Sequence, residues 1–298
     1  MIYKIIANTA AGRGKVLDLL PEIERTFIRE GLNYDLERTK YPGEAIDLAA
    51  GVAGGGYEAV VAVGGDGTIR EVASGLVGTG VALGIIPSGM GNDLARSLSI
   101  PDDVRAAIKV LRNPGRRRLD LGRDNGRYFA GVLGLGFPVE VMQRINSVRN
   151  WFVRGSGAFL LAVLGVLYKL DAHRLKLEID GQELEKNLVA LFIMNTPYTG
   201  GGMHIIPRAR PDDGYLDLAL VGDLGTLELA RELPRVYKGT HTSHHKVSFF
   251  RARSIKVSAD PADHLLKMYD GDVMGKTPVD AHIIPGALEV LVPREGIE

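Results

Sequence analysis

Cysteine is absent from all 298 residues, which excludes disulfide scaffolds, thiolate nucleophiles and cysteine-ligated metal sites. The chain also has no net charge, because 36 Lys and Arg balance 36 Asp and Glu. No basic field therefore favours nucleic acid as a partner. The longest apolar run covers eleven residues, 158–168, against roughly 20 needed to span a bilayer. These absences leave an ordinary globular protein.

The start of the chain shows no secretory signal, because Met1 leads directly into a strand-like segment at 3–7. We therefore expect a cytoplasmic protein. The apolar segment from Trp151 to Leu170 has basic residues around it, including Arg154 and Lys169. It is either a core helix or an apolar wedge with a basic rim that touches the inner face of a membrane. The sequence leaves both interpretations open.

Glycine, in contrast, is abundant. The chain has 38 glycines, about 13% of its residues against a usual share of roughly 7%. Thirteen of them lie in the 41 residues from Gly51 to Gly91. Glycine is needed where the backbone takes positive φ or comes close to a ligand, so the excess indicates a local site.

Strand and helix patterns alternate through the first half of the chain. We expect strands at 3–7, 32–38, 59–63 and 81–86, and helices at 15–30, 43–52, 69–76, 93–98 and 101–111. The unbroken apolar run Ala59–Val63 is typical of a strand buried on both faces of a parallel sheet. The alternation predicts an open α/β domain, which we place at residues 1–128.

Strand patterns dominate the second half. We expect strands at 175–179, 184–194, 215–221, 254–257, 265–269, 279–284 and 288–292, and one helix at 224–237. Asp180-Gly181 lies between the first two strands and is a hairpin signal. The pattern predicts a mainly antiparallel all-β domain, which we place at residues 129–298.

Three loops that follow strands of the first half are rich in small residues. They are 8–15, 63–68 and 87–93. Ligands of parallel α/β sheets sit where strand ends lead into helix N-termini, and backbone N–H groups in glycine-rich loops can face an anion. The first loop is not a Walker A loop, because Thr9 and Val16 stand where that motif needs Gly and Ser or Thr.

Asp66 is the unusual residue of the second loop, Gly64-Gly65-Asp66-Gly67-Thr68. A carboxylate repels phosphate unless it binds Mg²⁺ or handles a proton. The alternative is that Asp66 only caps the next helix, where Asp is favoured. The third loop, Pro87 to Asp93, allows the same alternative, since Asn92 or Asp93 can cap a helix.

These loops resemble the catalytic domain of the diacylglycerol kinase family, and most of all its bacterial lipid kinases. The match continues through Tyr198-Thr199-Gly200-Gly201-Gly202, the segment 207–215, Asp270-Gly271-Asp272 and Pro285-Gly286-Ala287-Leu288. The resemblance implies two domains, an α/β domain of the NAD kinase and diacylglycerol kinase type and a C-terminal β-sandwich, with ATP in the cleft between them. It also implies the ATP contacts Asn8, Thr9, Ala10, Ala11, Gly12, Thr39, Gly65, Asp66, Gly67, Thr68, Ile69, Arg70, Glu71 and Met90.

The resemblance further implies two magnesium features. Asp66, Asp93 and Asp120 match acidic positions in a water and Mg²⁺ network near the family's site. A structural Mg²⁺ would take the Asp213 side chain and the backbone carbonyls of Arg210 and Tyr215. Ligation by oxygen alone suits this hard cation.

The chain departs from the family pattern at two positions. Met90 stands where the family usually has Thr, which removes a hydroxyl contact to nucleotide phosphate. Asp272 stands where it has Glu, which shortens the side chain by one methylene.

Phosphoryl transfer to an alcohol needs phosphate positioning, Mg²⁺ and a carboxylate that accepts the hydroxyl proton. Our hypothesis is that Asp270 and Asp272 orient and deprotonate a lipid hydroxyl, while Asp66 holds the metal or shares the base role. The alternative is that Asp270-Gly271 is only a hairpin turn. His241, His244 and His245 cluster in sequence, but no carboxylate lies nearby, so we interpret them as loop or packing residues.

The predicted activity is an ATP-dependent lipid kinase of phospholipid biosynthesis, with diacylglycerol as the acceptor and phosphatidic acid as the product. Phosphatidylglycerol or a sphingoid base is an alternative acceptor. An NAD kinase-like enzyme and a catalytically weak nucleotide-binding regulator are alternative functions. The expected partner is a lipid at a membrane surface, and a homodimer stays open.

Overall fold

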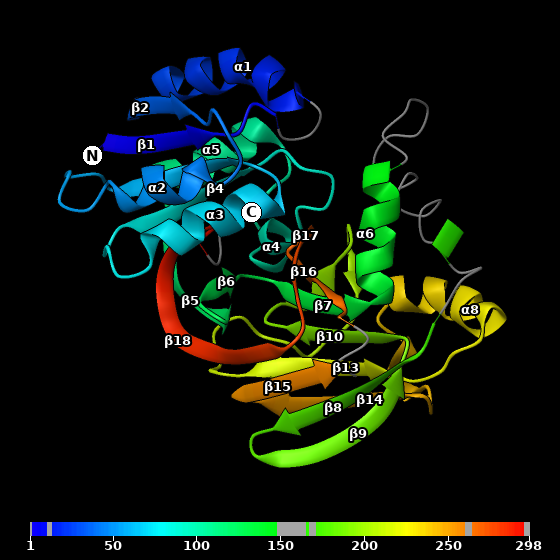
Figure 1. Cartoon of the computed structure of the whole chain (residues 1–298). Coiled ribbons are helices and arrows are strands. Elements are labelled where there is room, and N and C mark those ends of the chain that lie inside the picture. The colour runs from blue at the N-terminus through cyan, green and yellow to red at the C-terminus, as the bar shows by residue number, and fades with distance from the viewer. Residues whose placement is uncertain (1, 11–13, 148–164, 167–170, 260–263, 295–298) are drawn as a thin grey trace. The chain divides into compact units, whose positions relative to one another are not determined.

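The computed structural model describes residues 2–10, 14–147, 165–166, 171–259 and 264–294 (Figure 1). Two compact units divide the chain. The α/β unit contains Met1–Asp120 together with Gly286–Glu298, and the β unit contains Leu121–Pro285. Our predicted boundary at 128/129 differs from this division, and so does our assignment of the whole C-terminus to the second domain. The reason is that two long strands, β5 (Gly115–Asp124) and β18 (Val279–Val292), each begin in one unit and end in the other.

A parallel sheet forms the centre of the α/β unit. Its strands are β1 (Ile2–Ala7), β2 (Asn33–Arg38), β3 (Ala59–Gly64) and β4 (Ala82–Pro87), in the order β2-β1-β3-β4. The end of β18 joins β4 in parallel, with Val290 opposite Leu83. Every residue of β3 and of β4 is buried, as the unbroken apolar runs predicted.

Helices follow these strands as the sequence patterns predicted. They are α1 (Lys15–Arg29), α2 (Glu44–Ala50), α3 (Asp66–Leu76), α4 (Asp93–Ser97) and α5 (Val104–Arg112). In α1 the residues Val16, Leu20, Ile23 and Phe27 are buried, because their spacing of three or four places them on one face. The predicted α/β class is confirmed.

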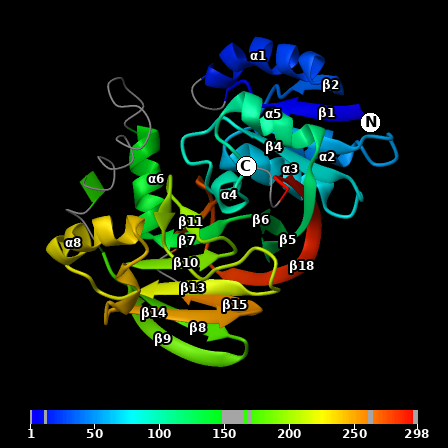
Figure 2. The same ribbon diagram turned by 180° about the vertical axis from the view of Figure 1, so that it is seen from behind.

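The β unit is an antiparallel sandwich. One sheet has the order β14-β13-β10-β7-β16-β17, and Figure 2 shows β7, β10 and β13 side by side. These strands are β7 (Val132–Gly136), β10 (Ala190–Met194), β13 (Leu216–Val221), β14 (Val247–Ala252), β16 (Leu266–Tyr269) and β17 (Asp272–Lys276). The facing strands have the order β18-β15-β8-β9, with β15 at Ser254–Ala259, β8 at His173–Ile179 and β9 at Gln182–Leu188. A short strand, β6 (Arg127–Phe129), pairs with β5.

Alternation along β10 illustrates the core. Leu191 and Ile193 pack between the two sheets. Ala190, Phe192 and Met194 pack on the outer face against α6 (Phe137–Ser147) and α8 (Thr226–Tyr237). Both faces of the strand are therefore covered, which explains its unbroken apolar sequence.

Three of the strands expected in the second half of the chain were wrong in their bounds. The expected strand 184–194 is two strands, because β9 pairs with β8 whereas β10 pairs with β7 and β13. The expected strands 279–284 and 288–292 are the single strand β18, which continues through Pro285-Gly286. The apolar segment from Trp151 to Leu170 lies almost wholly outside the described residues. Among the helices that are described, none is both long and apolar enough to cross a membrane.

Candidate active site

The loops after β3 and β4 are in direct contact. A Cβ on Gly89 would lie 2.5 Å from the Gly65 Cα, a distance at which only glycine fits. Ser88 N–H also donates to the Gly64 carbonyl at 2.8 Å. The two glycine-rich loops predicted from sequence therefore form one continuous backbone surface at the carboxyl edge of the sheet, where parallel α/β proteins bind ligands.

Asp66 connects this surface to the following helix. It is the first residue of α3, whose N-cap is Gly65, so it does not occupy the capping position that the alternative interpretation gave it. Its Oδ1 instead accepts the Leu94 N–H of α4 at 3.2 Å. The side chain is half-buried, at the junction of two helix N-termini.

Asn92 shapes the loop after β4. It is the N-cap residue of α4, with a left-handed φ of 53°, and its Oδ1 accepts the Gly89 N–H at 2.9 Å. Met90, between the flanking glycines, is exposed. Asp93 pairs with Arg96 at 2.8 Å, so it has a local partner on its own helix.

The loop after β1 meets the same edge of the sheet. Asn8 Nδ2 donates to Thr68 Oγ1 at 3.0 Å, and Asn8 Oδ1 accepts the Ala10 N–H at 3.1 Å. Thr39, at the end of β2, donates its N–H to the Ala7 carbonyl at 3.0 Å. The structure thus brings together the ends of all four predicted nucleotide-binding segments.

All the predicted nucleotide contacts stay predictions, and their surroundings differ. Ala11 and Gly12 lie outside the described residues. Ile69 is fully buried, and its N–H donates to the Gly65 carbonyl at 3.0 Å, so it supports α3 from within. Thr68 and Arg70 are also buried, whereas Thr9 and Gly67 are at least partly accessible.

Asp120 lies on β5 in the same unit and is buried. Its Oδ1 accepts the Gly286 N–H at 2.6 Å. Within the described residues, no three His, Asp or Glu side chains converge closely enough to hold a metal ion by themselves. The predicted Mg²⁺ network of Asp66, Asp93 and Asp120 would therefore have to act through water and nucleotide phosphate.

Asp270 and Asp272 border the hairpin between β16 and β17. Asp270 and Gly271 both have positive φ, 47° and 91°, as a two-residue type I′ turn requires. The Asp270 carboxylate is buried and accepts three backbone N–H groups, from Ala130, Gly131 and Val132, each at 2.8 Å. Asp272 pairs across the turn with Tyr269 and is only partly buried.

The two carboxylates lie in different environments. The backbone of Asp270 forms the hairpin turn, as the alternative interpretation held. Its carboxylate oxygens accept hydrogen bonds from backbone N–H groups. Asp272 begins the next strand and keeps part of its side chain exposed. Which of them touches substrate stays a prediction, but the two do not occupy equivalent environments.

Asn195 and Thr196 are site-adjacent residues that the sequence analysis missed. Both are fully buried. Asn195 Nδ2 donates to the Ala130 carbonyl at 2.9 Å and its N–H to the Gly131 carbonyl at 2.8 Å. They brace the backbone that holds Asp270. The signal in the sequence was a polar pair directly after the buried strand Leu191–Met194.

The predicted structural Mg²⁺ site already contains a cation of the chain. Asp213 Oδ1 accepts the Tyr215 N–H at 3.2 Å, and its other oxygen pairs closely with Arg251. The Arg251 guanidinium also lies 4.2 Å from the centre of the Tyr215 ring. The oxygen donors suit a hard cation, and Arg251 balances the carboxylate charge here, so the structural Mg²⁺ stays a prediction.

The histidine cluster is divided. His241 is buried and its Nε2 lies 3.0 Å from the Ile205 carbonyl, while the rings of His244 and His245 stack at 4.8 Å. Burial lowers the pKa of His241, and it also lowers that of His204. His241 is thus a packing residue of the β unit.

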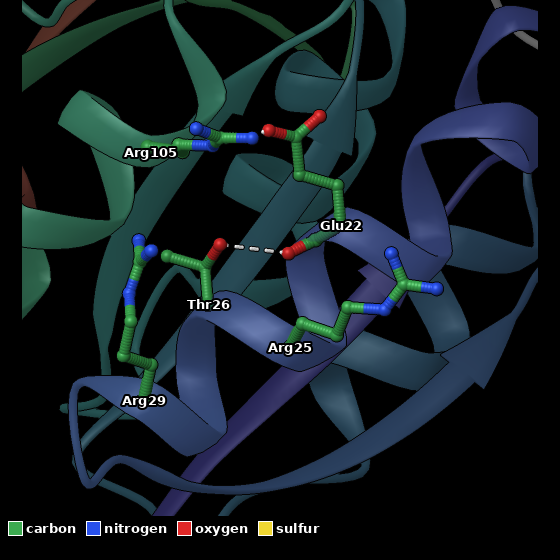
Figure 3. A pocket seen from close by; sticks show the side chains of 5 residues that line it. All are labelled: Glu22, Arg25, Thr26, Arg29 and Arg105. Atoms are coloured by element: carbon green, nitrogen blue, oxygen red, sulfur yellow. Dashed lines mark hydrogen bonds and ion pairs between the residues drawn. The ribbon is translucent and has the colours of Figure 1, made fainter.

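A pocket of about 300 Å³ lies elsewhere on the α/β unit, between α1 and α5 (Figure 3). It is lined by Glu22, Arg25, Thr26, Arg29 and Arg105. Arg105 Nε and Glu22 Oε1 are 2.6 Å apart, and Thr26 Oγ1 donates to the Glu22 carbonyl at 2.7 Å. None of the predicted site residues lines it, and the Arg105–Glu22 ion pair connects the two helices.

An α/β unit with glycine-rich strand ends, together with an antiparallel sandwich, defines the class of NAD kinase-like and diacylglycerol kinase-like proteins. Comparison with known proteins agrees. The diacylglycerol kinase catalytic domain matches residues 3–123, and the YegS C-terminal NAD kinase beta sandwich-like domain matches residues 131–292. The chain therefore belongs to the diacylglycerol kinase family.

Individual relatives support this assignment. A protein named diacylglycerol kinase from Mycobacterium tuberculosis is 35% identical over 257 residues, which cover 84% of this chain and 81% of the relative. One of the same name from Staphylococcus saprophyticus is 30% identical, over 98% of this chain and 95% of its own. A crystal structure of a diacylglycerol kinase from Bacillus anthracis has a TM-score of 0.79 at 23% identity, covering 99% and 98% of the two chains. That likeness shows the fold.

Proposed function

We propose that this protein is an ATP-dependent lipid kinase that transfers the γ-phosphate of ATP to the hydroxyl of diacylglycerol, giving phosphatidic acid. Family membership and the names of its relatives support this acceptor. The observation that carries the proposal is the glycine-rich edge of the α/β unit, where Gly65 and Gly89 touch and backbone N–H groups can face phosphate.

ATP binds along this edge in our proposal. The loops after β1, β3 and β4 supply backbone donors, and Asn8 and Thr68 hold the first two loops together. Magnesium, when bound with the nucleotide, neutralises charge that develops on the transferred phosphoryl group. Asp66, Asp93 and Asp120 would hold it through water.

Asp272 is the group that we assign to proton transfer. The acceptor hydroxyl must lose its proton as the bond to phosphorus forms, and a partly exposed carboxylate is the base for it. Asp270 fits a different role, because three backbone N–H groups occupy its oxygens. It holds the turn that presents Asp272.

The acceptor reaches the protein from a membrane surface in this proposal. Because this acceptor is a membrane lipid, the proposal includes peripheral contact with the cytoplasmic face of a membrane. Other lipid alcohols, such as phosphatidylglycerol or a sphingoid base, are distinguished from diacylglycerol only by assay.

The test is transfer of radiolabel from γ-labelled ATP to a panel of lipids in mixed micelles, with NAD as a further acceptor. We expect labelled phosphatidic acid, and no label with Asp272→Asn. If only another lipid is labelled, that lipid is the acceptor instead of diacylglycerol. If only NAD is labelled, the protein has an NAD kinase-like activity and is not a lipid kinase. ATP binding without transfer to any acceptor would indicate a nucleotide-binding regulator.

A further inference from the structure

A buried charged cluster lies immediately before the Asp270 turn. Lys267 Nζ and Asp124 Oδ2 are 2.6 Å apart, and the Tyr269 hydroxyl donates to the same oxygen. Asp124 and Tyr269 are almost fully buried, and Lys267 is only 4% exposed. All three belong to the β unit. The sequence analysis predicted none of the three as a site residue, and the proposed reaction mechanism gives none of them a role.

The cluster is well satisfied by hydrogen bonds. Asp124 Oδ1 accepts the Asp280 N–H at 2.8 Å and the Asn125 amide at 2.9 Å. Lys267 Nζ donates a second bond to the Pro278 carbonyl at 3.2 Å. It thereby connects three parts of the chain: the end of β5, the strand β16 and the start of β18.

Strand β16 is held from both of its faces. Lys267 and Tyr269 project to one face, where Tyr269 joins the core between the sheets. Met268 projects to the other and packs with the cluster around α6. Asp270 follows directly after this strand and accepts the three N–H groups of residues 130–132. Asp272 is only two residues further along the chain.

Stability alone is a poor explanation for such a pair. Removing two charges from water is costly, and apolar residues of similar volume often replace a buried ion pair without loss of stability. A directional tether is different, because it fixes a strand in one position, and a small misplacement of a reacting group can cost about a hundredfold in rate.

We propose that Lys267, Asp124 and Tyr269 are positioning residues that hold β16, and through it the turn at Asp270, so that the Asp272 carboxylate stays in its reactive position. This inference rests on the proposed function, because it assigns the base role to Asp272. It adds residues to the site that contact neither nucleotide nor acceptor.

The experiment compares four variants of the full-length protein. Lys267→Met removes the ammonium but leaves the Asp124 charge buried. Asp124→Asn with Lys267→Met removes both charges, and Tyr269→Phe removes only a hydroxyl. Leu177→Ala on β8, buried in the same core, is the control for lost stability alone. Tm, kcat, KM for ATP and amide hydrogen exchange of residues 270–273 are measured for each.

We expect Lys267→Met to lower Tm and to lower kcat by about tenfold to a hundredfold, with KM for ATP unchanged. The double variant regains Tm but keeps the loss of kcat, and exchange at 270–273 is about tenfold faster in both. Tyr269→Phe folds normally and shows the same pattern, reduced to a few-fold. Leu177→Ala loses Tm with kcat within about twofold of wild type.

Recovery of kcat together with Tm in the double variant would overturn the proposal, and so would unchanged exchange at 270–273. If Lys267→Met fails to fold, the double variant and Tyr269→Phe decide the matter. If the wild-type protein phosphorylates no lipid, the proposed function fails, whereas the exchange measurement still reports whether this cluster holds the turn.

Discussion

Gly89 and Gly65 are in backbone contact, since a Cβ on Gly89 would lie 2.5 Å from the Gly65 Cα. The two residues belong to loops that leave neighbouring parallel strands. Neither has a positive φ, so glycine is required here by close approach and not by backbone conformation. The contact makes one surface from two loops, and it can be tested directly.

Gly89→Ala should push the two loops apart. We expect ATP binding to weaken by about tenfold, equivalent to about 1.4 kcal/mol, with a loss of stability of about 1–3 kcal/mol from overpacking. Isothermal titration calorimetry with ATP and denaturant unfolding measure the two effects. Gly51→Ala is the control, because its new Cβ would meet nothing closer than 3.4 Å. Wild-type affinity in Gly89→Ala would contradict the close contact.

Asp272→Asn should lower kcat strongly without affecting the fold. A carboxamide cannot accept the hydroxyl proton, so we expect kcat to fall by about 10²–10⁴-fold with an unchanged Tm. Steady-state kinetics and a thermal scan measure both. A kcat near that of wild type would remove Asp272 from the mechanism.

Asp270→Asn should behave differently. The new NH₂ group would face backbone N–H donors that the carboxylate now satisfies, and leaving buried donors unsatisfied costs about 1–3 kcal/mol. We expect a lower free energy of unfolding, together with reduced kcat because the turn shifts. Full stability with lost activity would instead indicate that Asp270 touches the substrate.

Chelation of metal should not change the Tm of the wild-type protein, because Arg251 balances the Asp213 carboxylate. Arg251→Met removes that cation and leaves the oxygen donors in place. We expect the Tm of this variant to rise with added Mg²⁺ and to fall with EDTA. A wild-type Tm that drops in EDTA would establish a structural metal at this loop.

Stability should fall in mild acid because of His241. Burial holds the pKa of this ring below its ordinary value of 6.5, so the unfolded chain takes up a proton as the pH falls through that value while the folded protein does not. Linkage then lowers stability below about pH 6.5 and leaves it unaffected above. We expect the Tm difference between pH 7.5 and 5.5 to shrink in His241→Gln. His204 is present in both proteins and does not affect this comparison, and an unchanged difference would contradict it.

Local patterns were sufficient for β1 to β4 and the helices of the α/β unit, but not for β5 or for the end of β18 that joins β4. Burial of both faces of β3 and β4 leaves unbroken apolar runs, and burial of one face of α1 leaves apolar residues at helical spacing. Both patterns can be recognised within a short stretch of sequence. The β unit was less predictable. Val189 separates β9 from β10, and its N–H donates to the Val221 carbonyl, which is a partner on another strand. Nothing local marks such a change of sheet.

The site divides in the same way. The sequence alone determined which loops carry glycine and carboxylates, and parallel strand order implied that their ends meet at one edge. Only the tertiary structure decided that Gly65 touches Gly89, that residues 130–132 hold Asp270, and that Asp124 reaches Lys267. These contacts join positions far apart in the chain, and because they depend on the packing of whole strands, no short sequence pattern records them.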